Sequence, residues 1–162
     1  GAVDYEGQAA AELESVIDES ADGAYSFEIY KNENNVLIFD WRRLIRDAID
    51  DALRGVGAPV ISARFHRACC NLVADAAEIL CQKSGFYNVA LSGGCFANVF
   101  LLEGCIRELR ARGLRVYTNE KVPAGDGGIS FGQAAAASEM MKRERQVRSD
   151  AITMTISKRR IN

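Results

Sequence analysis

Apolar side chains recur at helical spacing over a long stretch that ends near Ser84. Pro59 suits the first turn of a helix, because the N–H groups of that turn have no partner within the helix. Steps of three or four residues between the apolar positions predict one buried stripe along this helix. The stripe comprises Ile61, Phe65, Cys69, Leu72, Ala76 and Leu80.

Two shorter helices and a hairpin are predicted before this helix. Residues 5–18 have an amphipathic pattern, and Asp40 can cap a second helix that stops near Gly55. Residues 26–31 and 36–39 are typical of short strands, and the polar residues between them suit a hairpin turn. The apolar faces are expected to comprise Ala9, Leu13, Val16 and Ile17 in the first helix, and Leu44, Ile45, Ala48, Ile49 and Ala52 in the second.

The second half of the chain predicts a strand, a helix and another strand. Residues 88–91 and 115–118 are the strands, and the helix between them runs to about Arg112, where Gly113 can end it. A strand, helix and strand within about 30 residues form a βαβ unit with parallel pairing. We therefore expect an α/β fold with a mixed sheet flanked by helices, followed by an Ala-rich helix around 129–141.

Composition and charge argue against several classes of protein. With 162 residues, 48% of them hydrophobic and 26% charged, the chain fits one globular domain. The net charge of -2 gives no general case for nucleic-acid or membrane binding. No apolar run approaches the roughly 20 residues that span a bilayer. The five cysteines form no CxxC pair, so we expect reduced thiols, no zinc site and a cytoplasmic protein.

The strongest chemical signal is the sequence Leu-Ser-Gly-Gly-Cys-Phe-Ala-Asn at 91–98, between a predicted strand and a predicted helix. Gly93 and Gly94 let the backbone approach a ligand closely. Their N–H groups can form an anion cradle, which the dipole of the following helix would reinforce. Ser92 can add a hydroxyl donor and Asn98 an amide. A simple tight turn is the alternative, because short glycine motifs are common.

A second signal is Asp126, which precedes Gly127 and Gly128 at the start of the last helix. Its carboxylate can reach a cation that bridges phosphates. Capping of the helix is the alternative role. Because both glycine loops follow predicted strands, we expect them to line one crevice at the carboxyl edge of the sheet. Nucleotide binding is therefore a serious hypothesis.

The single histidine, His66, lies on the long helix. We interpret it as a buried or boundary residue that is hydrogen-bonded to backbone; contact with a ligand phosphate or with the rest of a catalytic domain is the alternative. Nothing resembles a Ser/His/Asp or Cys/His triad, and Cys95 is interpreted as structural. A Rossmann-type dinucleotide site is disfavoured, because no GxGxxG follows a first strand.

The last residues are basic, with seven Lys or Arg against two acids from Lys142 onward. A solvated helix end and tail is the favoured interpretation, and an acidic partner is the alternative. We assign residues 1–141 to one subdomain and residues 142–162 to a basic tail.

Four segments, in this order, resemble the end of the catalytic domain of the HypF carbamoyltransferases. They are YEGQAA with Leu13 and Glu14, ARFH at 63–66, LSGGCFAN at 91–98 and DGGISFGQ at 126–133. The larger family includes the tRNA threonylcarbamoyl-transfer enzymes, and the first two segments favour HypF over those relatives. The resemblance covers roughly residues 3–140.

The resemblance implies an actin/Hsp70-like (ASKHA) fold, in which two subdomains close over a nucleotide. HypF enzymes use carbamoyl phosphate and ATP to make a carbamoyl-adenylate. They pass the carbamoyl group to the C-terminal cysteine of the partner HypE, for the cyanide ligands of nickel–iron hydrogenases. By this resemblance Asp126 would bind a divalent metal ion (Mg or Fe/Zn). The nucleotide would be bound by Ser92, Gly93, Gly94, Asn98, Gly127 and Gly128.

This sequence also departs from the family pattern. The HxxxH metal motif and the N-terminal half of the catalytic domain are missing, and Cys95 and Ala97 stand where the family usually has Val and Gln. We therefore expect a fragment that is inactive alone. The alternatives are a related O-carbamoyl or tRNA threonylcarbamoyl transferase and a non-catalytic docking module. The lack of a basic patch outside the tail counts against nucleic acid.

Overall fold

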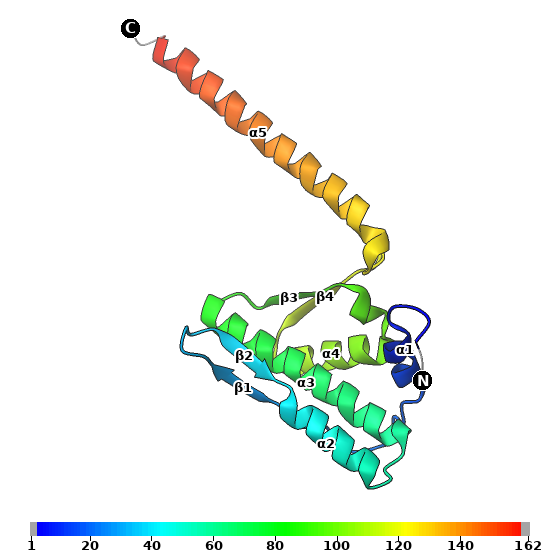
Figure 1. The fold of residues 1–162 in the computed structure, drawn as a ribbon. Coiled ribbons are helices and arrows are strands. Elements are labelled where there is room, and N and C mark those ends of the chain that lie inside the picture. The colour runs from blue at the N-terminus through cyan, green and yellow to red at the C-terminus, as the bar shows by residue number, and fades with distance from the viewer. Residues whose placement is uncertain (1–2, 160–162) are drawn as a thin grey trace. The chain divides into compact units, whose positions relative to one another are not determined.

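A computed structural model describes the backbone of residues 3–159 and the side chains of residues 3–149. The chain forms two compact units, one up to Thr118 and one from Asn119 onward. The elements of the first unit, drawn in Figure 1, are α1 (Gln8–Ser15), β1 (Glu28–Lys31), β2 (Leu37–Asp40), α2 (Arg42–Leu53), α3 (Ala58–Ser84), β3 (Asn88–Leu91), the short 3-10 helix η1 (Gly94–Ala97), α4 (Val99–Ala111) and β4 (Arg115–Thr118).

Strands β1 and β2 pair antiparallel as a hairpin. The turn is held by Asn32, whose side-chain oxygen accepts hydrogen bonds from the backbone N–H groups of Asn34 and Val36 at 3.0 and 2.9 Å. Asn35 has a φ of 59°, a left-handed conformation that asparagine tolerates better than most residues. The predicted hairpin is confirmed, with strand boundaries shifted by one or two residues.

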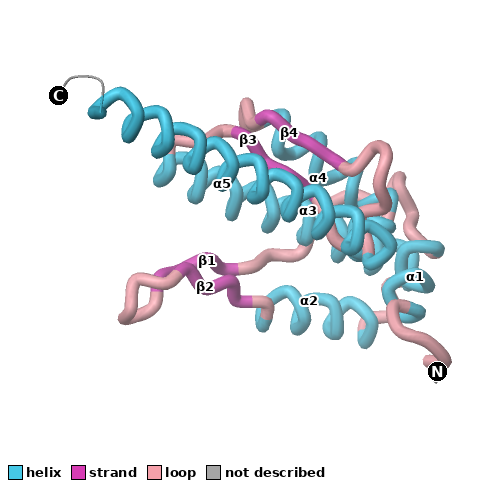
Figure 2. Tube along the Cα trace, turned by 90° about the horizontal axis from the view of Figure 1, so that it is seen from above, coloured by secondary structure: helices cyan, strands magenta, loops and turns pink. Residues whose placement is uncertain are grey.

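Helix α3 lies between α2 and α4 and contributes to a hydrophobic core on each side (Figures 1 and 2). On the side of α2, Leu44 and Tyr25 contact Ala68 of α3. The second cluster joins α3 to α4 and to the strand pair β3–β4. Its buried members are Cys70, Ala74, Cys81, Leu91, Cys105, Leu109 and Leu114.

The bounds predicted for α3 are confirmed, but the single buried stripe is not. Leu80 is 55% exposed, whereas Ser62 and His66, outside the stripe, are buried. Helices pack on two sides of α3, so its buried positions are spread around the helix. Small side chains occupy many of them, because they let neighbouring helices approach closely.

The closest approach of α3 and α4 occurs at Gly104 of α4. A Cβ atom added there would lie nearer to the sulfur of Cys70 than the 3.0 Å that real Cβ atoms respect. Cys70 and Gly104 are both buried, and the Cys70 thiol donates a hydrogen bond of 3.7 Å to the carbonyl of Leu101. Glycine at 104 therefore sets the distance between the two helices.

Helix α2 buries less than its sequence pattern predicts. Leu44 is fully buried, but Ile45 and Ile49 are 47% and 54% exposed, and Ala52 is exposed. Helix α3 packs on one side of α2, and one neighbouring helix shields a narrower face than the apolar pattern spans. Asp40 does support the start of α2, because its carboxylate accepts a hydrogen bond from Arg42 N at 3.0 Å.

Helix α1 is shorter than predicted and contains no buried residue. Its expected apolar face is at best half-buried, and Val16 is 41% exposed.

The predicted βαβ unit is confirmed as β3–α4–β4. The two strands are parallel, and Leu91 at the end of β3 is the register partner of Thr118 at the end of β4. Gly113, with a φ of 76°, provides the left-handed residue that follows α4. The α/β fold class is thus confirmed. The predicted mixed sheet is wrong: within the described residues the antiparallel and the parallel strand pair form two separate sheets, because α3 lies between them (Figure 2).

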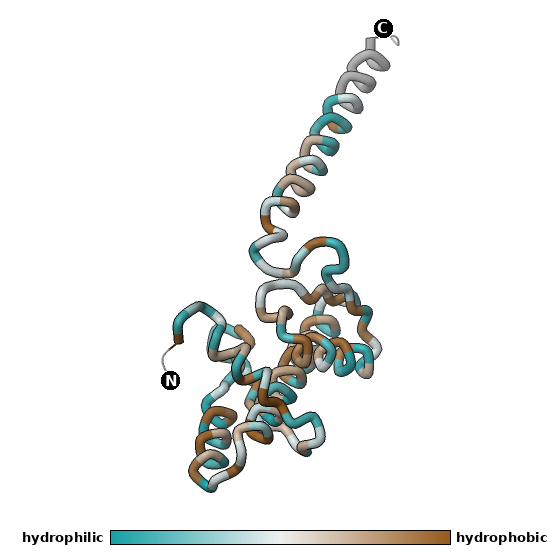
Figure 3. Tube along the Cα trace, turned by 90° about the vertical axis from the view of Figure 1, so that its right-hand side faces the viewer, coloured by the Kyte–Doolittle hydropathy of each residue, from teal (hydrophilic) through white to brown (hydrophobic). Residues whose placement is uncertain are grey.

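The second unit contains a short 3-10 turn, η2 (Asp126–Gly128), and one long helix, α5 (Ile129–Arg159). Helix α5 continues well past Met141, the predicted end of this helix, so the basic residues from Lys142 to Arg159 belong to the helix. In the part of α5 that Figure 3 colours by hydropathy, short hydrophobic stretches alternate with hydrophilic ones. Residues 160–162 of the expected tail lie outside the described residues. Neither α3, α5 nor any other described helix has the length and apolarity of a membrane span.

Candidate functional site

The glycine loop, defined here as residues 92–94, follows β3 directly. Gly93 has a φ of 112°, a conformation that favours glycine. A Cβ atom added at Gly93 or Gly94 would meet no atom within 4 Å, so both residues border open space. The first bond of η1 runs from Phe96 N to the carbonyl of Gly93 (3.1 Å), so the N–H groups of Gly94 and Cys95, the first two residues of η1, have no partner within the turn. The loop can therefore offer backbone donors to an anion.

The start of α4 is already occupied by protein groups. Asn98 caps it, because its side-chain oxygen accepts a hydrogen bond from Leu101 N at 2.7 Å. The carboxylate of Glu14 accepts bonds from Val99 N and Phe100 N at 2.7 and 3.4 Å. These acceptors satisfy the donors that a helix N-terminus would otherwise offer to a ligand.

This arrangement corrects one expectation about the anion cradle. The turn η1 separates the glycine loop from α4, and Glu14 holds the position that an anion would take at the helix N-terminus. The dipole of α4 therefore does not reinforce the cradle. Binding of a phosphate at the loop would depend on its backbone N–H groups and on the hydroxyl of Ser92, which is exposed.

His66 is 5% exposed and is hydrogen-bonded on both ring nitrogens. Nδ1 lies 2.8 Å from the carbonyl oxygen of Ser62, and Nε2 lies 2.9 Å from the side-chain nitrogen of Asn98. The rings of Phe65 and Phe100 meet the imidazole edge to face, with centroids 6.0 and 5.8 Å away. The interpretation of His66 as a buried residue bonded to backbone is confirmed.

The contacts of Asn98 and Glu14 join segments far apart in sequence. The hydroxyl of Ser62 also donates to the carbonyl of Leu13, so α1, α3 and the start of α4 form one hydrogen-bonded junction. Sequence reasoning did not find this role for Glu14 or the pairing of His66 with Asn98. The residues of these two contacts are 85 and 32 positions apart, and no local sequence pattern links positions so far apart.

The second loop has Asp126 as the first residue of η2. The Asp126 side chain is exposed, and it makes no hydrogen bond or ion pair within residues 119–149. The residue that precedes the turn is Gly125, whose carbonyl accepts a bond of 3.0 Å from Gly128 N. Asp126 therefore does not act as the side-chain cap that was the alternative prediction, and its carboxylate is free for another partner.

The two glycines after Asp126 differ in what they allow. A Cβ at Gly128 would collide with the carbonyl oxygen of Pro123, so this position requires glycine. At Gly127 the nearest atoms are those of the Pro123 ring, at 3.7 Å or more, and a side chain would fit. Gly128 thus shapes the loop through close packing.

Asp126 can serve as one ligand of a metal ion. A carboxylate suits Mg²⁺, Fe²⁺ or Zn²⁺. Within the described residues no three His, Cys, Asp or Glu side chains gather in a way that would hold a metal ion. The remaining ligands would have to come from elsewhere.

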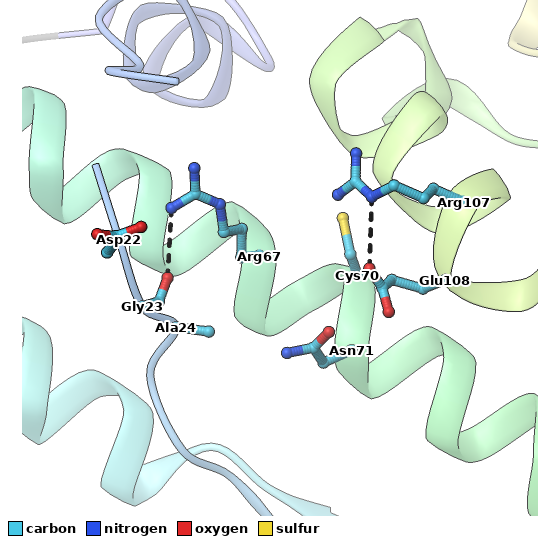
Figure 4. A pocket seen from close by; sticks show the side chains of 8 residues that line it. All are labelled: Asp22, Gly23, Ala24, Arg67, Cys70, Asn71, Arg107 and Glu108. Atoms are coloured by element: carbon cyan, nitrogen blue, oxygen red, sulfur yellow. Dashed lines mark hydrogen bonds and ion pairs between the residues drawn. The ribbon is translucent and has the colours of Figure 1, made fainter. Parts of the chain in front are cut away.

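A separate cavity of about 430 Å³ lies between α3, α4 and the segment before β1 (Figure 4). Arg67 lines it and donates hydrogen bonds to the carbonyls of Glu19, Ala21 and Gly23, so its charge holds this segment in place. Arg107 pairs with Glu108 at 3.5 Å. Both arginines thus contact protein groups, and none of the residues predicted to bind nucleotide lines the cavity.

Three of the five cysteines lie in the core, whereas Cys95, which was interpreted as structural, does not. All five are free, and Cys70, Cys81 and Cys105 are buried. A hydrogen bond from Cys105 lowers the pKa of Cys70, and the same bond, together with burial, raises the pKa of Cys105. Cys95 is exposed but takes no part in either core.

Comparisons with known proteins agree with this architecture. Residues 1–133 match the family model described as the second subdomain of the Kae1-like domain of carbamoyltransferases. The chain is 36% identical, over 83% of its length, to the carbamoyltransferase HypF of Synechocystis, and 36% identical over 87% to that of Rhizobium leguminosarum. It spans only 17% and 18% of those two proteins.

Solved structures show the same likeness. A crystal structure of full-length HypF in its phosphate- and nucleotide-bound form is 39% identical, with a TM-score of 0.79. The structure of HypF from T. kodakarensis is 25% identical, with a TM-score of 0.67. Each match covers 86% of this chain and 18% of the other.

Proposed function

The chain belongs to the family formed by the second subdomain of the Kae1-like carbamoyltransferase domain, and we propose that it supplies part of a nucleotide site in an enzyme of the HypF type. In this proposal the glycine loop binds phosphates of ATP, and the carboxylate of Asp126 is one ligand of a divalent metal ion. The likeness to full-length HypF in its phosphate- and nucleotide-bound form supports a nucleotide-binding role for this fold.

The register of β3 and β4 is the observation that carries the proposal. Leu91 and Thr118 are partners at the ends of two parallel strands. The glycine loop begins at Ser92, and the segment leading to Asp126 begins at Asn119, so both leave the same carboxyl edge of the sheet. Ligands of α/β proteins bind at the carboxyl edge of the strands.

Each site residue has a role that its surroundings permit. The N–H groups of Gly94 and Cys95 precede the first bond of η1, and the hydroxyl of Ser92 is exposed, so all three can donate to phosphate oxygens. Asn98 uses one amide hydrogen toward His66 and retains a second for the nucleotide. Gly127 and Gly128 would shape the loop that presents Asp126.

The reaction proposed for the whole enzyme has two stages. ATP, carbamoyl phosphate and water give a carbamoyl-adenylate, pyrophosphate and phosphate. The thiol of the C-terminal cysteine of a HypE-like maturation protein then takes the carbamoyl group, and AMP leaves. The bound metal ion would neutralise phosphate charge. This chain would contribute positioned donors and one carboxylate, which act by orientation and electrostatics rather than as a nucleophile.

The chain is proposed to be inactive without the other half of the catalytic domain. It spans less than a fifth of the relatives it matches, and its described residues offer one metal-ligand candidate at the loop rather than a full set. Formation of a carbamoyl-adenylate by the 162-residue chain alone would contradict this part of the proposal.

A graft tests the role of Asp126. The second subdomain of a full-length HypF relative is replaced with this chain, and ATP–pyrophosphate exchange dependent on carbamoyl phosphate is measured. Asp126→Ala should lower the rate by about 100-fold or more, as the loss of a metal ligand does. Glu120→Ala is the matched control, because it removes an exposed carboxylate from the same connecting segment. Equal rates for the two variants would refute the metal-ligand role.

A further inference from the structure

The hydrogen bonds around His66 define its tautomer. The carbonyl of Ser62 can only accept, so the ring nitrogen 2.8 Å away, Nδ1, must carry the hydrogen. In the neutral ring Nε2 then has a free lone pair. It lies 2.9 Å from the side-chain nitrogen of Asn98, which can only donate. The buried imidazole therefore accepts a hydrogen bond from Asn98.

The same contacts determine the orientation of the Asn98 amide. Its nitrogen donates to His66, and its oxygen accepts from Leu101 N at 2.7 Å. If the amide were flipped, its NH2 group would face the N–H of Leu101, so two donors would oppose each other. Its oxygen would face the lone pair of His66 Nε2, so two acceptors would oppose each other. Asn98 is thus held from both sides.

Asn98 also closes the turn that follows the glycine loop. Its backbone N–H donates to the carbonyl of Cys95 at 3.2 Å, and η1 itself begins at Gly94. A fixed Asn98 therefore fixes the end of the turn whose start presents the loop N–H groups. Glu14 holds the next two residues through Val99 N and Phe100 N.

From this geometry we infer that His66 is a positioning residue for nucleotide binding, acting through Asn98 on the glycine loop. The inference rests on the proposed function, because it assigns His66 to the same site. His66 does not touch the nucleotide. Its Nε2 acceptor keeps the Asn98 amide oriented, with the second amide hydrogen and the turn in the arrangement that binds phosphate.

Two substitutions separate the two hydrogen bonds of His66. His66→Gln places an amide oxygen near the position of Nε2, so it can still accept from Asn98. His66→Asn places a donor near Nδ1, so it keeps the contact with Ser62 but is too short to reach Asn98. Both variants remove a buried ring, so a purely structural role predicts similar effects for the two.

The experiment measures binding of Mg²⁺·ATP to the 162-residue chain by NMR titration, after circular dichroism has verified helix content in each variant. His66→Asn should weaken binding by about five- to tenfold, the worth of one neutral hydrogen bond, whereas His66→Gln should stay within about twofold of wild type. Equal weakening in both variants, or wild-type affinity in both, would overturn the positioning role.

A second readout does not depend on substitution. The ring ¹⁵N shifts of His66 in the wild-type chain should show hydrogen on Nδ1 and a lone pair on Nε2. The opposite tautomer would overturn the inference even if nucleotide binds. If the wild-type chain shows the expected tautomer but does not bind Mg²⁺·ATP, the proposed function fails, and the role of His66 in binding fails with it.

Discussion

The contact between α3 and α4 can be tested by placing a methyl group in it. Gly104→Ala introduces a Cβ atom that would overlap the sulfur of Cys70, with the Cys70 Cβ also near, at 3.5 Å. Overpacking of a core costs about 1–3 kcal/mol. Alanine also stabilises a helix interior by about 1 kcal/mol relative to glycine. The net expectation is a loss of about 1 kcal/mol in the free energy of unfolding.

The sign of this effect should reverse when the sulfur is removed. In a Cys70→Ala background the overlap is gone, and only the helix-propensity gain remains, so Gly104→Ala should stabilise by about 0.5–1 kcal/mol. The coupling between the two sites is then about 1–3 kcal/mol, as expected for residues in contact. Urea unfolding of the four proteins, followed by far-ultraviolet circular dichroism, measures it.

Gly132→Ala is the control for this cycle, because a Cβ there meets nothing within 4 Å. It should raise helix content without changing the free energy of unfolding of the first unit. If Gly104→Ala destabilises equally with and without the Cys70 sulfur, close packing at Cys70 is not what sets the distance between α3 and α4.

Two further predictions concern the stability of the first unit. Leu44→Ala should lower the free energy of unfolding, measured in urea, by about 2–5 kcal/mol, because Leu44 is fully buried. Ile45→Ala in the same helix should lower it by less than about 1 kcal/mol, because Ile45 is 47% exposed. Similar losses for the two variants would contradict the burial pattern of α2. Hydrogen bonds from Arg64 and then Tyr25 lower the pKa of Asp51 below its ordinary 3.8, so its contribution to stability is complete above that value and is lost as the pH falls through the lowered pKa. The stability difference between wild type and Asp51→Asn should therefore shrink as the pH falls from about 5 to about 2, and a constant difference would refute the role of the charge.

The sequence predicted the elements whose signals are local. The bounds of α3, the hairpin and the β3–α4–β4 unit are confirmed, because each depends on periodicity, turn residues and capping within a short window. The exposure of Ile45 and Ile49 was not predictable from pattern, because burial depends on how many neighbours pack on α2.

The candidate site was only partly accessible from the sequence. The glycine loop and its place after β3 were predicted from residue type and position. The hydrogen bond from the N-terminus of α4 to Glu14 was not predictable, because Glu14 and Val99 are 85 positions apart in the sequence. The same holds for the bond between His66 and Asn98, which depends on α3 lying beside the start of α4. Long-range contacts of this kind require the packed structure.

Backbone N–H groups of the glycine loop are the central element of this account, and an NMR titration of the ¹⁵N-labelled chain with Mg²⁺·ATP tests them most directly. We predict binding with a dissociation constant on the order of 1 mM, a value suited to half of a site, with the largest amide shifts at Ser92, Gly93, Gly94 and Cys95. Gly94→Ala should abolish these shifts, because its Cβ would occupy the space beside the loop where a phosphate would bind. The chain should stay folded, because this Cβ meets no protein atom within 4 Å. Shifts confined to the cavity lined by Arg67 and Arg107, with the glycine loop unmoved, would contradict the account.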